Sequence, residues 1–202
     1  MAFRQADVRE ALRDTIPSPA DDPNERVAAV AAVLRDRPHG LELLFIRRAT
    51  RRGDPWSGHM AWPGGKREPR DDSLLACAVR ETKEEVGLDL ATEGELIGTL
   101  RPWRQAGGRA RLRAVYPFVF VVEGEEGPVL RSGGEVQEAV WIPLSYFSVW
   151  RSRRPWSFLA RWLPPTPPVY RYQGRVIWGL TLWMLSDLLA RLARQRGLRP
   201  EA

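Results

Sequence analysis

The sequence predicts an α/β protein with a mixed sheet between helices, and three observations lead to this class. Apolar runs rich in β-branched residues, typical of strands, occupy residues 26–34, 41–48 and 114–122. A capped amphipathic run over residues 73–86 predicts a helix. Leucines at three- and four-residue spacing in residues 182–192 predict a second packed helix. Strands alternating with helices favour a sheet covered by helical layers.

The chain of 202 residues has the length of one compact domain with a substantial core. We expect one domain over residues 1–202, with its core between about residues 26 and 192. No apolar run is long enough to cross a membrane, and the mixed-charge N-terminus is unlike a secretion signal. The single cysteine, Cys77, fits a reducing compartment, so a cytoplasmic location is expected.

The net charge of +6 comes almost entirely from arginine, because Lys66 and Lys83 are the only lysines. A basic protein attracts anionic partners. The arginines are dispersed and form no basic helix or tail, so no specific nucleic acid partner is expected. The arginine fork matches phosphate oxygens, which favours a polyphosphorylated small molecule as the partner.

Before the central motif, residues 7–12 predict a short amphipathic helix that prolines end. The strands at 26–34 and 41–48 flank the turn sequence DRPHG at residues 36–40 and therefore predict a hairpin.

The central motif is the stretch GGKREPRDDSLLACAVRETKEEVGL at residues 64–88. Asp71, Asp72 and Ser73 are good residues to begin a helix, and Gly87 is a good residue to end one. At 100° per residue, one face of this helix would carry Leu75, Val79, Thr82 and Val86. A different arc, about 100° wide, would carry Glu81, Glu84 and Glu85.

Three neighbouring carboxylates repel one another and weaken a helix unless a counter-charge holds them. Hard divalent cations are the natural counter-charge, because they prefer carboxylate oxygens. We therefore expect Glu81, Glu84 and Glu85 to be ligands of Mg²⁺ or Mn²⁺. A solvated acidic face is the alternative.

The second half of the motif resembles the Nudix box, Arg-Glu-apolar-x-Glu-Glu-x-Gly-apolar. The matching residues are Arg80, Glu81, Glu84, Glu85, Gly87 and Leu88, with Thr82 at the apolar position. Gly65 lies six residues before Asp71 and seven before Asp72, one residue longer than the family pattern requires, and one of these aspartates stands in place of its first glutamate. Both departures are similar to the Nudix subgroup that hydrolyses coenzyme A.

A second stretch, residues 43–65, is similar to the motif LLxxR…HxGxxxFPGG of that subgroup. It matches at Leu43-Leu44, at Arg47 or Arg48, at Gly58 and at residues 62–65. Trp56 stands in place of the motif's histidine, and His59 follows Gly58 where the subgroup often has glutamine. The resemblance implies substrate-binding roles for Arg47, Arg48, Trp56, Gly58 and His59. For His59 alone, a hydrogen-bonding loop residue is favoured over a metal ligand.

The resemblance also implies individual roles. The carbonyl of Gly64 and the three glutamates would bind metal, and Arg80 would orient a glutamate. Glu135, six residues before Trp141, would be a further ligand or the base, with Glu138 as the competing candidate. A plain surface-loop role is open for both. The expected fold is the α/β/α Nudix sandwich.

The implied reaction is metal-dependent hydrolysis of the P–O–P bridge of coenzyme A to 3′,5′-ADP and 4′-phosphopantetheine. Other Nudix substrates remain alternatives, namely ADP-ribose, a nucleoside triphosphate or a dinucleoside polyphosphate. A non-catalytic module that binds nucleotides or RNA is a further alternative, which three crowded glutamates argue against.

Two other segments carry open alternatives. The arginine- and glycine-rich residues 101–113 form either a mobile hairpin tip or a phosphate-contacting loop. Residues 149–168 interleave arginine with tryptophan before a proline run, a composition that can bind nucleic acid. We favour a packed insert, a lid or a homodimer surface there. At the C-terminus, Ile177 and Trp178 begin a stretch that is similar to the entry of the last helix in the coenzyme A subgroup.

Overall fold

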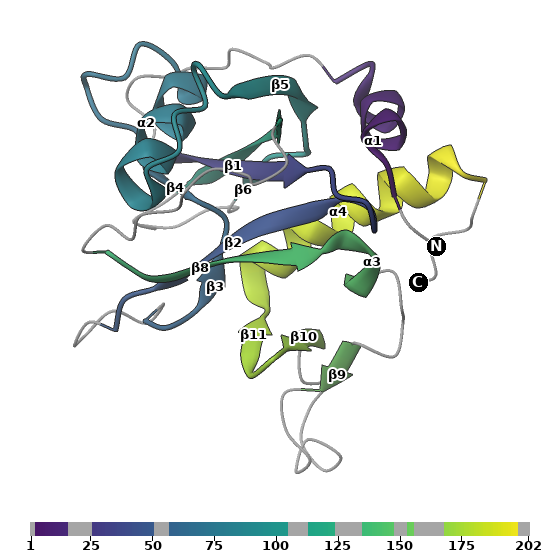
Figure 1. The fold of residues 1–202 in the computed structure, drawn as a ribbon. Helices are drawn as coiled ribbons and strands as arrows, with labels where there is room; N and C mark the ends of the chain where they lie inside the picture. Colours follow the sequence, from purple (N-terminus) through teal and green to yellow (C-terminus); the bar gives the residue numbers. More distant parts are fainter. Residues whose placement is uncertain are drawn as a thin grey trace.

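The computed structural model describes residues 3–15, 26–50, 57–104, 113–123, 135–147, 153–155 and 168–197 (Figure 1). Its helices are α1 (Gln5–Leu12), α2 (Leu74–Val86), α3 (Leu144–Phe147) and α4 (Gly179–Gln195). The strands up to the middle of the chain are β1 (Val27–Arg35), β2 (Glu42–Arg48), β3 (Met60–Ala61), β4 (Gly64–Lys66), β5 (Gly94–Thr99) and β6 (Trp103–Arg104). The remaining strands are β7 (Ala114–Val122), β8 (Val136–Pro143), β9 (Arg153–Pro155), β10 (Pro168–Tyr172) and β11 (Arg175–Ile177).

The main sheet is mixed, as expected. Strands β1 and β7 run parallel and pair along their whole lengths, from Val27–Ala114 to Arg35–Val122. The other pairings in this sheet are antiparallel, with β5 and β6 on β7 and with β8 on β2. β1 and β2 form the predicted hairpin, in which Leu34 pairs with Leu43.

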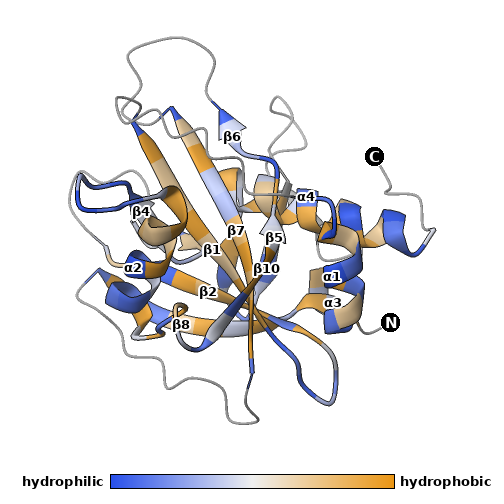
Figure 2. Cartoon of the chain, turned by 90° about the horizontal axis from the view of Figure 1, so that it is seen from above, coloured by the Kyte–Doolittle hydropathy of each residue, from blue (hydrophilic) through white to orange (hydrophobic). Residues whose placement is uncertain are grey.

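β1 and β2 spread apart beyond that hairpin. Beyond the hairpin, β1 pairs with β4, and Val30 lies opposite Gly64. β2 pairs with β3, and Arg47 lies opposite Met60. Figure 2 shows the two strands diverging toward the side where α2 and β4 lie. The short segment from β3 to β4 therefore crosses the gap and brings the glycine pair beneath α2.

Helices cover both faces of the sheet, and the predicted α/β/α sandwich is confirmed (Figure 1). One buried cluster joins α2 to one face through Leu44, Ile46 and Ala29. The other joins α1 and α4 to the opposite face through Leu43 and Phe45. Alternate residues of β2 thus point to opposite helical layers, as the pleat of a strand requires.

The buried side of α2 differs from the predicted one. Thr82 and Val86 are buried as expected, but Leu75 and Val79 are only partly buried. Cys77 and Ala78 are fully buried, and Glu85 belongs to this buried side instead of sharing an exposed arc with Glu84. The helical count was right, but it could not show that a carboxylate faces the sheet. The thiol of Cys77 is buried, and burial raises its pKa to about 12.

The C-terminal part follows the sequence closely. β10 and β11 form a hairpin whose two loop residues, Gln173 and Gly174, have φ angles of 46° and 81°. Two positive φ values are what a tight two-residue turn needs to match strand twist. In α4, Leu182, Leu185, Leu188 and Leu192 are buried and Leu189 is partly buried, as predicted.

Two predicted segments fall largely outside the described residues. Of residues 101–113, positions 105–112 are not described, so the phosphate-loop alternative stays a prediction. Of residues 149–168, the structure describes β9, which pairs with β10. The expected lid or homodimer role of that insert likewise stays a prediction.

Candidate active site

Helix α2 begins and ends as its sequence indicates. The Ser73 hydroxyl accepts the N–H of Ala76 at 3.0 Å, and Gly87 ends the helix with a left-handed φ of 76°. These two caps fix the register in which Arg80, Glu81 and Glu85 meet the glycine turn of β4.

Glu85 is buried, with 7% of its surface exposed. Its carboxylate accepts the Gly64 N–H at 2.9 Å. Burial nevertheless raises the Glu85 pKa to about 8, against the opposing effect of that hydrogen bond. Desolvation is the largest cause of the rise, and the positive charge of Arg48 offsets only part of it.

Glu81 lies one turn earlier, beside Gly65. A Cβ atom on Gly65 would come within 2.3 Å of the Glu81 carboxylate, so the glycine leaves the space that this side chain fills. Burial raises the pKa of Glu81, although Arg80 Nη1 donates to it at 2.9 Å. Glu81 and Glu85 are thus two partly desolvated carboxylates at one glycine turn.

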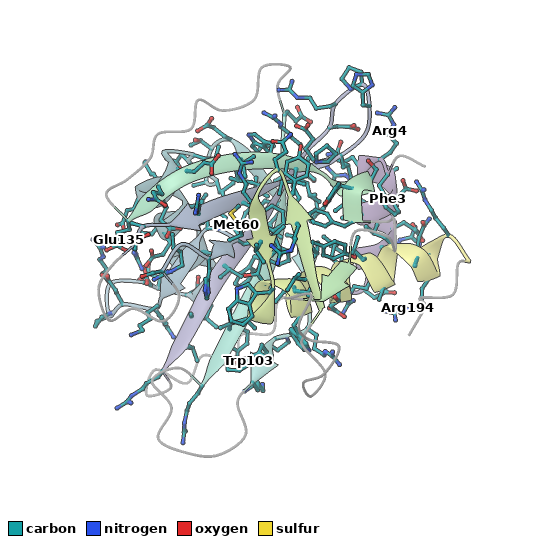
Figure 3. All side chains as sticks on the ribbon, turned by 90° about the horizontal axis from the view of Figure 1, so that it is seen from below. Phe3, Arg4, Met60, Trp103, Glu135 and Arg194 are labelled. Atoms are coloured by element: carbon teal, nitrogen blue, oxygen red, sulfur yellow. The ribbon has the colours of Figure 1, made fainter. Side chains whose placement is uncertain are left out.

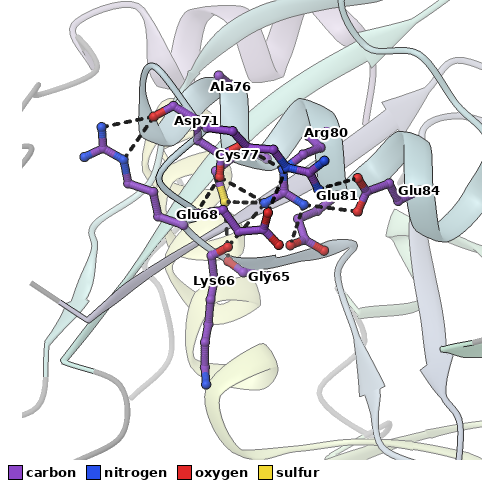
Figure 4. Close-up of polar contacts among 12 residues, drawn as sticks. Gly65, Lys66, Glu68, Asp71, Ala76, Cys77, Arg80, Glu81 and Glu84 are labelled. Atoms are coloured by element: carbon purple, nitrogen blue, oxygen red, sulfur yellow. Dashed lines mark hydrogen bonds and ion pairs between the residues drawn. The ribbon is translucent and has the colours of Figure 1, made fainter. Parts of the chain in front are cut away.

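Arg80 holds the polar network together (Figure 4). Its Nε and Nη2 atoms donate to the two oxygens of Asp71 at 2.8 and 3.0 Å. Its Nη1 atom donates to Glu81 and, at 3.1 Å, to Glu84. Arg80 therefore lies among three carboxylates, which raises its pKa, with Asp71 as the largest contributor.

Of the two neighbouring aspartates, Asp71 is the one that binds Arg80. It is 5% exposed, whereas Asp72 is exposed, so the structure resolves which of the two belongs to the network. Its carboxylate also accepts the N–H of Glu68 at 2.8 Å. The bidentate pair with Arg80 holds the Asp71 pKa below its ordinary value.

Replacing Asp71 with Asn should destabilise the fold by about 3 kcal/mol, because Arg80 then loses its main buried partner. The stabilisation by Asp71 is present above the ordinary carboxyl pKa of 3.8 and is lost as pH falls through the lowered value. The deficit of Asp71→Asn relative to wild type should therefore shrink between pH 7 and pH 3. Urea unfolding measures it, and Asp72→Asn is the matched control that should stay within about 0.5 kcal/mol. Equal effects of the two variants would contradict this assignment.

Glu84 differs from the other two glutamates of the box. It is exposed and lies between Arg70, at 3.1 Å, and Arg80. Within the described residues, no three His, Cys, Asp or Glu side chains are grouped to hold a metal ion. A metal role for Glu84 would require its carboxylate to leave these arginines.

The donor set at the glycine turn fits a hard divalent cation. Glu81 and Glu85 supply carboxylate oxygens, which such cations prefer. Burial raises the pKa of each, because desolvation disfavours the charged form. A bound cation would offset that cost, so Glu81 and Glu85 stay the predicted ligands.

The two glutamates near the start of β8 lie in different surroundings. The negative charge of Glu135 raises the pKa of Glu85, and the positive charge of Arg48 lowers it. Both residues therefore lie on the side of the sheet that α2 covers. The carbonyl of Glu135 also accepts the Ala49 N–H at 2.9 Å. Glu138 instead forms an ion pair with Arg175 of β11, which lowers the Glu138 pKa. Glu138 is thus paired with Arg175, and Glu135 stays the predicted ligand or base.

The residues with implied substrate roles divide between the two faces of the sheet. Arg48 lies near Glu85, whereas Arg47 lines a cavity with Gly58 and His59. The backbone brings these segments together, since the Arg48 N–H donates to the His59 carbonyl at 3.0 Å. The rings of His59 and Trp178 are in edge-on contact, with their centroids 4.8 Å apart. Trp56 lies outside the described residues.

Sequence reasoning missed Arg175 altogether. Its ion pair joins β8 to the C-terminal hairpin, and only the folded arrangement brings them together. The sequence limited the aspartate of the box to Asp71 or Asp72. The resemblance included Trp178 but implied no role for it. No local pattern marks an arginine in a short strand as part of a distant cavity.

The α/β/α sandwich brings the buried Glu85 and the partly buried Glu81 of one helix to a glycine turn. Comparison with known proteins assigns this arrangement to hydrolases that act on pyrophosphate bonds. The model of the NUDIX domain matches residues 25–163. A Nudix hydrolase, NudL, of Photorhabdus laumondii is 32% identical over 166 residues, covering 82% of this chain and 84% of that protein. The chain therefore belongs to the Nudix hydrolase family, whose members generally use divalent metals.

Two further relatives share parts of the sequence. The human mitochondrial coenzyme A diphosphatase NUDT8 is 29% identical over 153 residues, covering 75% of this chain and 63% of that protein. A protein of Schizosaccharomyces pombe, C14C4.10c, is 42% identical over 107 residues, covering 51% of this chain and 32% of that protein. Among the described helices, none has both the length and the apolar character that crossing a membrane requires.

Proposed function

We propose that this Nudix hydrolase cleaves the P–O–P bridge of coenzyme A or its derivatives, giving 3′,5′-ADP and 4′-phosphopantetheine. The observation that carries the reaction type is the buried carboxylate of Glu85 beside the partly buried carboxylate of Glu81 at the Gly64–Gly65 turn. The coenzyme A assignment is supported by the motif at residues 43–65. It is also supported by the similarity to human NUDT8, which is named as a coenzyme A diphosphatase.

Each residue has a distinct part in the proposed mechanism. Glu81, Glu85 and the Gly64 carbonyl would hold Mg²⁺ or Mn²⁺, with Glu84 as a further ligand. When bound, such an ion neutralises the pyrophosphate and lowers the pKa of a water molecule. Arg80 keeps Glu81 in place through the 2.9 Å contact and is itself anchored on Asp71. Arg80 is thus a positioning residue.

Glu135 would accept the proton of the attacking water. The water oxygen forms a new P–O bond to one phosphorus, the bridging P–O bond breaks, and the bridging oxygen leaves on the other phosphate. Arg48, whose charge acts on Glu85, would face the negative charge that develops on the phosphates.

Hydrolysis should require a divalent cation. Purified protein with coenzyme A should give no 3′,5′-ADP in EDTA and should regain activity when Mg²⁺ or Mn²⁺ is restored. Chromatographic detection of both products tests the substrate and the bond that is cut. Full activity in EDTA would reject the metal-dependent mechanism. Greater activity on ADP-ribose, a nucleoside triphosphate or a dinucleoside polyphosphate would keep the hydrolase and replace the substrate.

A further inference from the structure

A cavity of about 170 Å³ lies on the face of β2 that is turned away from α2. It forms where β11 packs against β3, and Figure 3 shows Met60 of β3 beside this hairpin. Its lining residues are Arg47, Gly58, His59, Met60, Gly174, Arg175, Val176 and Trp178. The cavity is therefore a composite of the β2–β3 end and the C-terminal hairpin.

The charges around the cavity leave an excess of positive charge. Arg175 is committed to the protein, because its Nε and Nη2 atoms donate to Glu138 and its Nη1 atom donates to the Gln173 carbonyl at 3.2 Å. Arg47 is exposed, and its positive charge, together with that of Arg175, lowers the pKa of Glu138. Among the described residues at this cavity, two arginines thus face one carboxylate, so the Arg47 fork can bind an anion.

The Arg175–Glu138 pair has a positioning role. It joins β11 to β8, and it lies beside the tight turn at Gln173 and Gly174 that forms one wall of the cavity. On the other wall, the edge-on contact between His59 and Trp178 closes the cavity with two rings. The cavity is therefore bounded by an ion-paired turn on one side and by two contacting rings on the other.

The size of the cavity restricts its ligand. Complete small-molecule sites usually have roughly 300–1,000 Å³, so this cavity has room for one group of a larger substrate. A phosphate group is small and anionic, and it matches an arginine fork.

The cavity is also within reach of the proposed reaction centre. Met60 is four residues from Gly64, so their Cα atoms are at most about 14 Å apart. Arg47 is close to the end of β2, and Arg48, next to it, lies near Glu85. A substrate that crosses the rim of the sheet at this point would meet both faces, with its pyrophosphate at the glycine turn and a second phosphate at the cavity.

We infer that this cavity is the specificity site for the 3′-phosphate on the adenosine end of the substrate. Arg47 donates to that phosphate, and the Arg175–Glu138 pair holds the hairpin wall in place. The inference rests on the proposed function and deepens it, because it assigns one phosphate of coenzyme A to a site outside the box.

The test compares kcat/KM for coenzyme A and dephospho-coenzyme A at one metal concentration. Wild type should favour coenzyme A by about 10- to 100-fold, the usual effect of a charged contact. Arg47→Gln should bring this ratio to within about threefold of one, and Arg47→Lys should keep part of it, since charge remains without the fork. Arg13→Gln, at an exposed arginine of the N-terminal segment, is the control and should keep the wild-type ratio.

A binding measurement separates this inference from the proposed reaction. Calorimetry without metal should show tighter binding of 3′,5′-ADP than of 5′-AMP to wild type, and Arg47→Gln should lose that preference. A wild-type ratio near one, or an unchanged preference in Arg47→Gln, would overturn the assignment. If wild type cleaves neither coenzyme A nor its dephospho form, the proposed function fails, and the binding preference still decides whether the cavity recognises the phosphate.

Discussion

Glu85→Gln should lower turnover by roughly two to four orders of magnitude while making the metal-free protein more stable. The loss of activity follows because the amide keeps the shape of the side chain but removes the charge that the mechanism needs. The gain in stability follows because Glu85 is buried with its pKa raised to about 8. Folding then has to desolvate a charge that the unfolded chain keeps in water.

The sign of the pH dependence is fixed by the direction of this shift. Between the ordinary pKa of 4.5 and the raised value near 8, the native state binds more protons than the unfolded state at this site. The contribution of Glu85 to stability is therefore full at low pH and declines as pH rises through this interval. In EDTA at pH 8 to 9, Glu85→Gln should be more stable than wild type by a few kcal/mol.

Thermal unfolding in EDTA at several pH values, with kinetics in Mg²⁺, measures both effects. The difference between variant and wild type should disappear near pH 4. Glu123→Gln alters an exposed glutamate at the end of β7 and should change neither quantity. An unchanged rate in Glu85→Gln would leave Glu85 with a structural role alone, and an unchanged stability at pH 8 would contradict its buried charge.

The two neighbouring glycines should respond differently to alanine. In Gly64→Ala the new Cβ would lie 2.3 Å from the Ala29 carbonyl oxygen and 2.6 Å from Val30 Cα, at a φ of +147°. Backbone atoms of β1 cannot move aside cheaply, so we expect at least about 3 kcal/mol of destabilisation or failure to fold.

In Gly65→Ala the new Cβ meets the end of a flexible side chain, the Glu81 carboxylate. This carboxylate can swing away, so the fold should survive while activity falls by about 100-fold through misplacement of the group. Urea unfolding and steady-state kinetics of both variants test the contrast, and Mn²⁺ titration of Gly65→Ala should show weaker binding. Similar stability of the two variants would contradict the close approach of β4 to β1.

The fold was predictable from the sequence because its main signals are local. The runs that form β1, β2 and β7, the caps of α2 and the leucine spacing of α4 each specify an element through nearby residues. The Nudix box likewise predicted Arg80, Glu81 and Glu85 as site residues. Glu85 on the buried side of α2 was not predictable, because helical counting gives angles and not the position of the sheet.

The relations that escaped prediction join distant segments. Arg175 meets Glu138 across 37 positions of sequence, and Trp178 meets His59 across a much longer interval. The choice between Asp71 and Asp72 depended on which side chain could turn inward to Arg80. Each of these contacts depends on the tertiary structure, which a single sequence indicates only through its resemblance to a known family.

The parallel pairing of β1 with β7 has a consequence for how the chain folds. Val27 cannot meet Ala114 until about 90 further residues have been made, which takes about 4 to 18 seconds at the usual speed of synthesis. During that time one edge of the apolar strand VAAVAAVLR lacks its eventual neighbour. The nascent chain should therefore pass through an interval in which β1 can pair wrongly with another chain, and slowing synthesis between β1 and β7 should increase aggregation.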